Sequence, residues 1–354
     1  MLPYLLTMLL ALGITYAVTP VVTRLCRALG AVDEPGRRRI NLKRVPNMGG
    51  LAIFTGFVSA ILIGPAGAGE HPGIILGASF ILILGIVDDI SGLSPRLKLL
   101  GQGGAAFILI FTGVSIEFIS NPLTGGIIHL GVWSIPLTLF WTVGIVNTLN
   151  LIDGLDGLAA GISTIAAITL FAVSLQEGRI ASAFMTAALA GSALAFLRFN
   201  FHPARIFLGD GGAMLVGYLL AAISITGALK SAAAVTVFVP VLALGIPIFD
   251  TAFAILRRLY NSRPIYKADH GHLHHRLLAL GWSQKQVAIV VYAISSLLGG
   301  LAVLVNGLNF QNGLIIMLVV ASSLIYGFWR LGVFTVRVPG KGSKLGGDSR
   351  QQEK

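Results

Sequence analysis

The sequence predicts an all-α polytopic membrane protein, a bundle of about 10–11 transmembrane helices. The chain has 354 residues, of which 55% are hydrophobic, and its mean hydropathy is +0.86. Apolar runs long enough to cross a bilayer recur along it and alternate with short polar segments. Helices satisfy their own backbone groups in lipid, and the strict alternation of barrel strands is absent.

Eleven apolar segments are expected to form helices, with ends placed to within a few residues. The stretch after Pro122 is a candidate for a surface segment, and Pro240 and Pro247 are candidates to break the ninth helix. The expected helices are residues 2–25, 49–65, 73–88, 98–115, 129–148, 157–175, 180–197, 212–229, 232–256, 286–305 and 312–332.

The charges predict which end of the bundle faces the cytoplasm. With the amino terminus outside and the carboxyl terminus cytoplasmic, 23 of the 25 Lys and Arg fall on the inner side, all but Arg179 and Lys230. The net charge of +11 therefore suits anionic lipid head groups and substrates, and does not indicate nucleic acid as a partner. We expect a single membrane domain over residues 1–335 and a basic, disordered cytoplasmic tail over 336–354.

The acids also gather on the inner side, although topology does not require it. Only Glu70, Glu117 and Glu177 of the 14 Asp and Glu fall outside. Five inner segments carry the polar residues, namely residues 37–50, 85–102, 150–161, 199–212 and 263–278. This clustering predicts a site that uses carboxylates.

Two of these segments hold paired acids. Asp88 and Asp89 close an expected helix, where the dipole and their mutual repulsion both disfavour charge. A divalent cation or a proton-transfer role resolves this conflict, and an acidic loop without function is the alternative. Asn150, Asp153 and Asp156 recur at i, i+3 and i+6, which places them on one side of a helix. A tight loop is the alternative to a helix here, with Gly154 and Gly157 allowing close backbone approach to a ligand. Helix capping is the alternative role for either aspartate.

The remaining segments supply a metal ligand and bases. Asp210 directly precedes an expected helix, so it is either an N-cap or a ligand for a hard cation such as Mg²⁺, which Asn150 could also hold. Four histidines lie within residues 270–275, and zinc is an alternative there, but no thiol accompanies them. Together with Lys43, Arg44 and Lys98 they suit a nucleotide diphosphate, with a lipid as the second reactant.

Five ordered motifs between Val32 and Leu278 resemble the polyprenyl-phosphate N-acetylhexosamine-1-phosphate transferases of glycosyltransferase family 4. They are "PNMGG", "VDDISGLSPRLKLLGQ", "NLIDGLDGL", "FLGDGG" and "HGHLHHRL". The resemblance implies transfer of a sugar 1-phosphate from a UDP-sugar to undecaprenyl phosphate, with release of UMP. It places the enzyme in the bacterial cytoplasmic membrane with its site on the cytoplasmic face.

The resemblance also implies roles for single residues. Asn150 and Asp210 would hold Mg²⁺, with Mn²⁺ as a substitute, and Asp88, Asp89 and Asp210 would be catalytic. Asp88 would take the proton of the lipid phosphate, and the ring of Phe207 would stack on uracil. Lys43 and Lys98 would neutralise phosphate charge. The implied substrate-binding residues are Lys43, Lys98, Asp153, Asp156, Phe207, His272, His274, His275 and Arg276.

The last motif resembles the GlcNAc-type branch, so UDP-GlcNAc is the expected donor and teichoic acid linkage-unit synthesis the expected setting. The alternative, the phospho-MurNAc-pentapeptide branch, has three consecutive histidines, whereas here Leu273 interrupts them. Relatives often have histidine where this chain has Asn41, so no role is assigned to that position. The reaction could proceed by direct attack or through a covalent aspartyl intermediate, and the sequence does not decide between them. The oligomeric state, monomer or homodimer, also stays open.

Two other classes compete with this interpretation. A secondary transporter would carry its ionisable groups near the middle of the membrane, often within an inverted repeat, and neither feature is seen. An intramembrane aspartyl protease would need glycine and tyrosine where this chain has Phe207 and Phe249.

Overall fold

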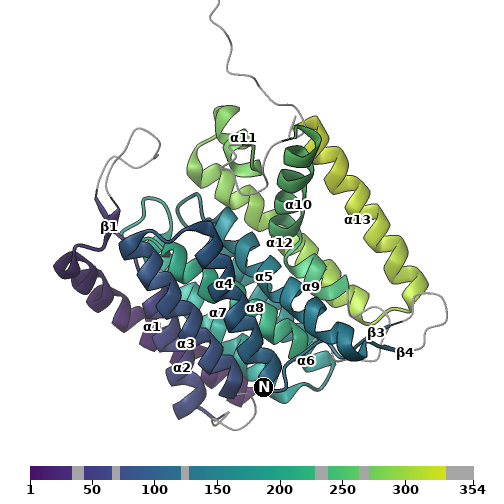
Figure 1. Ribbon diagram of the computed structural model, residues 1–354, viewed down its shortest axis with the longest axis horizontal. Coiled ribbons are helices and arrows are strands. Elements are labelled where there is room, and N and C mark those ends of the chain that lie inside the picture. The colour runs from purple at the N-terminus through teal and green to yellow at the C-terminus, as the bar shows by residue number, and fades with distance from the viewer. Residues whose placement is uncertain (34–43, 66–71, 121–126, 228–237, 263–270, 332–354) are drawn as a thin grey trace, which may run out of the picture.

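The computed structural model describes residues 1–33, 44–65, 72–120, 127–227, 238–262 and 271–331 as a helical bundle (Figure 1). Lys43, Asn41 and the tail over 336–354 lie outside these residues. The helices are α1 (Leu2–Leu29), α2 (Gly50–Ile63), α3 (Pro72–Ser91), α4 (Pro95–Phe111), α5 (Ser134–Ile152), α6 (Leu158–Gln176), α7 (Ile180–Asn200), α8 (Gly209–Gly227), α9 (Phe238–Ala243), α10 (Gly245–Tyr260), α11 (Leu273–Ala279), α12 (Gln284–Asn306) and α13 (Phe310–Arg330).

Ten of the eleven expected helices appear as single elements, and the ninth is divided. The break falls at Leu244, between Pro240 in α9 and Pro247 in α10, where the sequence offered two candidate break points. The short helix α11 was not among the expected helices. Two small antiparallel pairs join β1 (Val32–Asp33) to β2 (Val45–Pro46) and β3 (Phe118–Ser120) to β4 (Ile127–His129).

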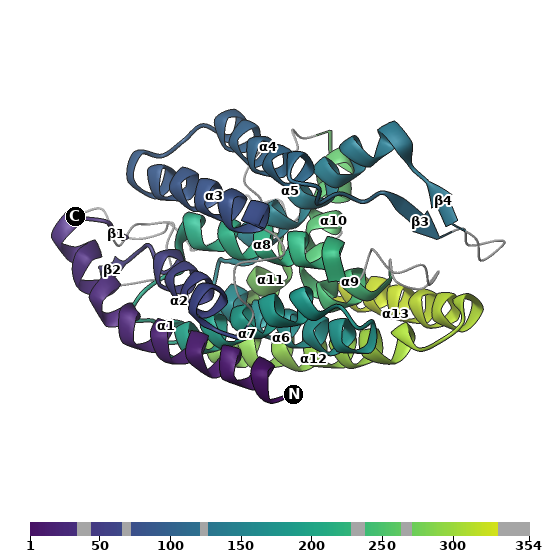
Figure 2. The same ribbon diagram turned by 90° about the horizontal axis from the view of Figure 1, so that it is seen from below.

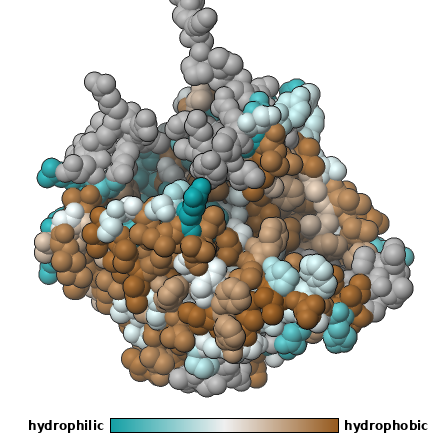
Figure 3. Space-filling model, in the orientation of Figure 1, coloured by the Kyte–Doolittle hydropathy of each residue, from teal (hydrophilic) through white to brown (hydrophobic). Residues whose placement is uncertain are grey.

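The predicted polytopic helical membrane bundle is confirmed. Over the described ranges, eight helices are long and apolar enough to cross a membrane: α1, α3, α5, α6, α7, α8, α12 and α13. Helix α2 is a shorter apolar helix. Apolar side chains cover most of the visible face below its upper edge (Figure 3), which is the surface that lipid tails would contact.

Helix α8 is the central helix of the bundle, and nearly all of its residues are buried. It packs against α2, α3, α5, α6 and α7, which surround it when the bundle is viewed from below (Figure 2). Its first turn approaches two neighbours closely enough to require glycine. A Cβ atom built on Gly85 would lie 2.0 Å from the Cα of Gly211, and one on Gly50 would lie 2.4 Å from the Cα of Gly212.

We therefore expect Gly85→Ala to lower the free energy of unfolding by about 1–3 kcal/mol, because backbone atoms of α3 and α8 must separate. Thermal denaturation of the purified protein in detergent measures this. Gly144→Ala on α5 is the matched control, since a Cβ there meets nothing within 4 Å. A Gly85→Ala protein as stable as the control would contradict the close approach.

Candidate active site

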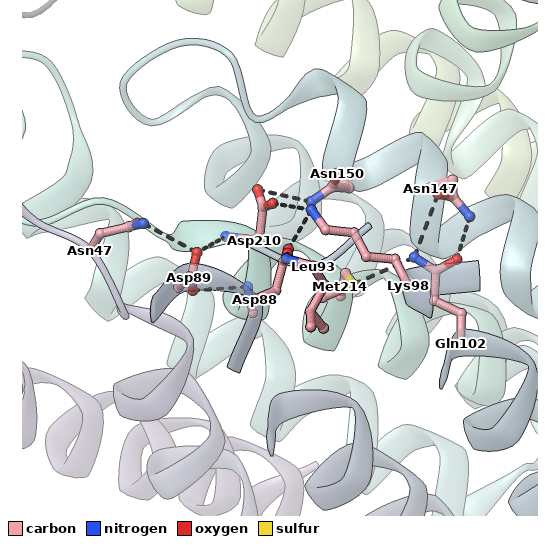
Figure 4. Close-up of polar contacts among 11 residues, drawn as sticks. Asn47, Asp88, Asp89, Leu93, Lys98, Gln102, Asn147, Asn150, Asp210 and Met214 are labelled. Carbon is pink, nitrogen blue, oxygen red and sulfur yellow. Dashed lines mark hydrogen bonds and ion pairs between the residues drawn. The ribbon is translucent and has the colours of Figure 1, made fainter. Parts of the chain in front are cut away.

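Four helix ends bring acidic, basic and amide groups together (Figure 4). Asp88 lies in the last turn of α3, Lys98 in the first turn of α4, Asn150 in the last turn of α5 and Asp210 in the first turn of α8. The Lys98 ammonium forms ion pairs with the carboxylates of Asp88 and Asp210, and its Nζ lies 2.6 Å from Asp210 Oδ2. Asn150 Nδ2 donates to Asp210 Oδ1 at 3.3 Å. We call these four residues, with Asp89, the carboxylate cluster.

Asp89 caps the amino end of α8. Its carboxylate accepts hydrogen bonds from the backbone N–H of Asp210 at 2.9 Å and of Gly211 at 3.2 Å. A negative charge at a helix amino end is favourable, and it satisfies donors that the helix leaves unpaired. The cap therefore comes from α3, and the alternative in which Asp210 caps its own helix is wrong. The Asp210 carboxylate is directed instead to Lys98 and Asn150.

The "PNMGG" and "FLGDGG" motifs are joined by backbone pairing. Phe207 N–H donates to the Pro46 carbonyl at 2.8 Å, and Gly49 N–H donates to the Phe207 carbonyl at 2.9 Å. Asn47, which pairs with Phe207 in this bridge, donates its side-chain amide to Asp89 at 3.2 Å. Half-buried Phe207 is thus held beside the cluster, where the resemblance predicts a ring for the base.

A second layer of polar side chains supports Lys98, and the sequence pattern did not predict it. Gln102, one turn further along α4, is buried, and its Oε1 accepts from Asn147 Nδ2 at 2.6 Å. Gln102 Nε2 contacts the sulfur of Met214 on α8 at 3.4 Å. These contacts fix the rotation of α4 relative to α5 and α8. The only sequence feature that indicates this layer is the position of Gln102, four residues after Lys98 and so on the same face of a helix.

Asp153 lies at the carboxyl end of α5, close to the cluster. Burial raises the pKa of Asp153 well above its ordinary value, and three neighbouring carboxylates raise it further. Those neighbours are Asp210, Asp89 and Asp156. Asp153 therefore lies within electrostatic range of the carboxylates of the cluster.

Asp156 uses its carboxylate elsewhere. Its Oδ2 lies 2.8 Å from His202 Nδ1 and accepts from the backbone N–H of Ala204 at 3.1 Å. Helix α5 ends at Ile152, and the following turn runs to Gly157, which has a φ of +79°, so the expected helical spacing of Asn150, Asp153 and Asp156 is not maintained. The structure therefore separates Asp156 from the carboxylate cluster and ties it to the turn after α7. Its implied role in substrate binding stays a prediction.

The histidine motif is held by a buried acid, Asp250, that the sequence pattern did not predict. Asp250 of α10 is 2% exposed, and its two oxygens bind the motif at two points. Oδ2 lies 2.8 Å from His272 Nδ1, and Oδ1 accepts from the backbone N–H of Leu273 at 2.8 Å. Asp250 therefore sets the orientation of the His272 ring and anchors the start of α11.

His274 connects the histidine motif to the Asn150 motif. A Cβ atom built on Gly154 would lie 2.6 Å from His274 Nε2, so the ring packs directly over that glycine. Both ring nitrogens are buried without a hydrogen-bond partner in the described part of the chain. Burial, together with His275 and His272, lowers the pKa of His274 to about 3. A neutral ring with one donor and one acceptor suits a hydroxyl group. His275 and Arg276 follow on α11, half-buried.

The oxygen atoms of the cluster fit a hard cation. Carboxylates and amides are the ligands that Mg²⁺ prefers, and the Lys98 ammonium already lies between two of these carboxylates. Among the described residues, however, no three His, Cys, Asp or Glu side chains form a complete metal site. A cation here would therefore take its remaining ligands from substrate and water, as Mg²⁺ commonly does.

We expect Asp153→Asn to raise the thermal midpoint more at about pH 8 than at about pH 5 in the presence of a chelator. The reason is the sign of the pKa shift. The folded state of Asp153 binds its proton more tightly than the unfolded state, so this group costs stability once the pH exceeds the unfolded pKa of about 3.9. Exposed Glu117→Gln serves as the control for loss of one charge. Equal shifts at the two pH values would contradict the assignment.

Comparison with known proteins agrees with this geometry. Residues 71–228 match the family model described as glycosyl transferase family 4. A Bacillus subtilis (strain 168) protein named probable undecaprenyl-phosphate N-acetylglucosaminyl 1-phosphate transferase is 40% identical over 303 residues, 85% of each chain. A Mycobacterium tuberculosis decaprenyl-phosphate N-acetylglucosaminephosphotransferase is 38% identical over 79% of this chain and 76% of its own. A Desulforudis audaxviator phospho-N-acetylmuramoyl-pentapeptide-transferase is 30% identical over 86% and 98%. The chain, with its carboxylate cluster at the ends of four bundle helices, belongs to glycosyl transferase family 4.

Proposed function

We propose that the protein transfers GlcNAc 1-phosphate from UDP-GlcNAc to undecaprenyl phosphate, giving undecaprenyl-diphosphate-GlcNAc and UMP. The observation that carries this proposal is the carboxylate cluster, in which Lys98 joins Asp88 of α3 to Asp210 of α8. Acids and an ammonium at the ends of membrane helices suit a reaction between a diphosphate and a lipid. The names of the relatives from Bacillus subtilis and Mycobacterium tuberculosis support the same acceptor class and sugar.

In the proposed reaction, an oxygen of the lipid phosphate attacks the sugar-bearing phosphorus of the donor. The P–O bond to the UMP phosphate breaks, and UMP leaves with the electron pair. Buried Asp88 is the candidate acceptor for the proton of the lipid phosphate, a light task because the second pKa of such a monoester is about 6. Lys98 neutralises phosphate charge, and Phe207 and His274 contact the base and the sugar.

Asn150 and Asp210 are the residues we propose to hold Mg²⁺, with Mn²⁺ as a substitute. The ion would supply charge neutralisation across the diphosphate, which is the main demand of phosphoryl transfer. Asp89 contributes by capping α8, which fixes the backbone of Asp210 relative to α3.

We place the site on the cytoplasmic face of the bacterial cytoplasmic membrane, where UDP-sugars are found. The product would begin teichoic acid or another cell-envelope polysaccharide, such as O-antigen lipopolysaccharide. Phospho-MurNAc-pentapeptide transfer is the second candidate, supported by relatives of that name at 30–32% identity. The sequence "HLHHR", with Leu273 between histidines, supports the GlcNAc donor.

Purified protein supplied with UDP-GlcNAc, undecaprenyl phosphate and Mg²⁺ should release UMP, measured by chromatography. UDP-MurNAc-pentapeptide and UDP-GalNAc, tested in parallel, should release far less. Asp210→Ala should abolish turnover, and Glu117→Gln should not change it. Wild-type activity in folded Asp210→Ala would remove this residue from the site, and preference for UDP-MurNAc-pentapeptide would favour the second candidate.

Asp250→Asn should lower kcat by about 10- to 100-fold, the range that follows from losing a hydrogen bond to a charged group. The substitution keeps the shape of the side chain but loses one of two acceptors, so the His272 ring is no longer held. Asp250→Glu should restore part of the rate. If Asp250→Asn changes only the thermal midpoint and leaves kcat unchanged, Asp250 serves stability alone.

A further inference from the structure

A cavity of about 490 Å³ lies beside the end of α7. Leu194 and Leu197 of α7 give it apolar lining, and Tyr292 of α12 lines it from the neighbouring helix. Two arginines, Arg198 and Arg205, complete this part of the wall. The carboxylates of the cluster are not among the lining residues, so the cavity is separate from the candidate active site. We call it the arginine cavity.

The arginine cavity has uncompensated positive charge. Arg198 and Arg205 are both exposed, and neither side chain pairs with an acid within the described ranges. The acid that contacts the same turn is Asp156, whose carboxylate is occupied by His202 and the Ala204 N–H. Guanidinium groups bind phosphate oxygens in pairs of parallel hydrogen bonds, so the cavity suits a phosphate group.

The position of the cavity relative to the membrane indicates a lipid. Helix α7 is long and apolar enough to span the bilayer, and Arg198 lies in its last turn. Leu194, one turn deeper, is 39% exposed and offers apolar surface directly beneath the arginine. A phosphodiester headgroup would meet the arginines while its glycerol and upper acyl carbons cover the leucines. A free phosphate would leave that apolar lining in water.

The wall of the cavity also supports the turn of the "NLIDGLDGL" motif. The Tyr292 hydroxyl donates to the Gly157 carbonyl at 2.6 Å, and Gly157 N–H donates to Asn200 Oδ1 at 3.1 Å. His202, another lining residue, holds Asp156. A molecule bound between α7 and α12 would therefore contact the side chains that hold this turn in place. The turn begins at Asp153, in the candidate active site.

We propose that the arginine cavity binds the phosphodiester headgroup of an anionic glycerophospholipid, and that the bound lipid stabilises the turn from Asp153 to Gly157. The binding part of this inference is independent of the proposed function. The consequence for turnover rests on the proposed function.

Binding is tested with the full-length protein in nanodiscs of phosphatidylcholine containing phosphatidylglycerol. Native mass spectrometry counts the phosphatidylglycerol that the protein retains on release. Arg198→Gln with Arg205→Gln should reduce retention by at least about 10-fold, since both charge-assisted contacts are lost. Arg24→Gln with Arg27→Gln is the matched control, because it removes two exposed arginines from the end of α1.

Two further arms separate the sources of phosphate. Leu197→Trp keeps both arginines but fills the apolar part of the cavity, so it should also reduce retention. Inorganic phosphate at millimolar concentration should not displace the lipid. Equal loss in the two double variants, full retention in Leu197→Trp, or displacement by inorganic phosphate would each overturn the proposal.

Turnover provides the last arm. UMP release by the wild type and by the Arg24, Arg27 control should rise with the fraction of phosphatidylglycerol, and release by the Arg198, Arg205 variant should not. The same rise in all three proteins would overturn the link to the turn. Absence of UMP release under every condition would count against the proposed function while the retention data still decide the lipid site.

Discussion

The ion pairs of Lys98 with Asp88 and Asp210 are the interaction on which the site depends. Carboxylates so close together repel, and each resists ionisation unless a cation lies between them. Lys98 provides that cation from the first turn of α4, and the backbone N–H groups at the start of α8 bind the carboxylate of Asp89. One ammonium therefore joins α3, α4 and α8 at the end where the substrates are proposed to meet.

That arrangement requires helix backbones to approach closely. Gly85 faces Gly211 and Gly50 faces Gly212, so the first turn of α8 fits between α2 and α3 without side chains between them. The acids next to these glycines are then held by helix ends and not by long loops. Functional groups on rigid elements keep their geometry more accurately than groups on loops. The density of glycine around Asp210 follows from this packing and from the turn that starts the helix.

The sequence predicted the helices and the gathering of polar groups at one end, because apolar length and charge asymmetry are local signals. It also predicted that Asp88, Lys98, Asn150 and Asp210 belong together. It did not predict that Asp156 would bind His202, because the two residues are far apart in the sequence. They meet only where the turn that ends at Gly157 contacts the turn after α7. Asp250 was missed for the same reason. Its partner, His272, is 22 residues away. A single acid in a helix forms no spacing pattern with other polar residues from which its partner could be predicted.

The charge balance of the cluster bears on how the proposed donor enters. Asp88, Asp89 and Asp210 together outnumber the single ammonium of Lys98, so the cluster attracts a further cation and repels a bare diphosphate. A diphosphate accompanied by a divalent ion removes this conflict, because the ion can take oxygen from Asp210 and from phosphate together. Lys98 would then need fewer contacts to carboxylates and could turn toward phosphate. The ion pairs that hold the helix ends together without substrate are thus the ones that the reaction would use.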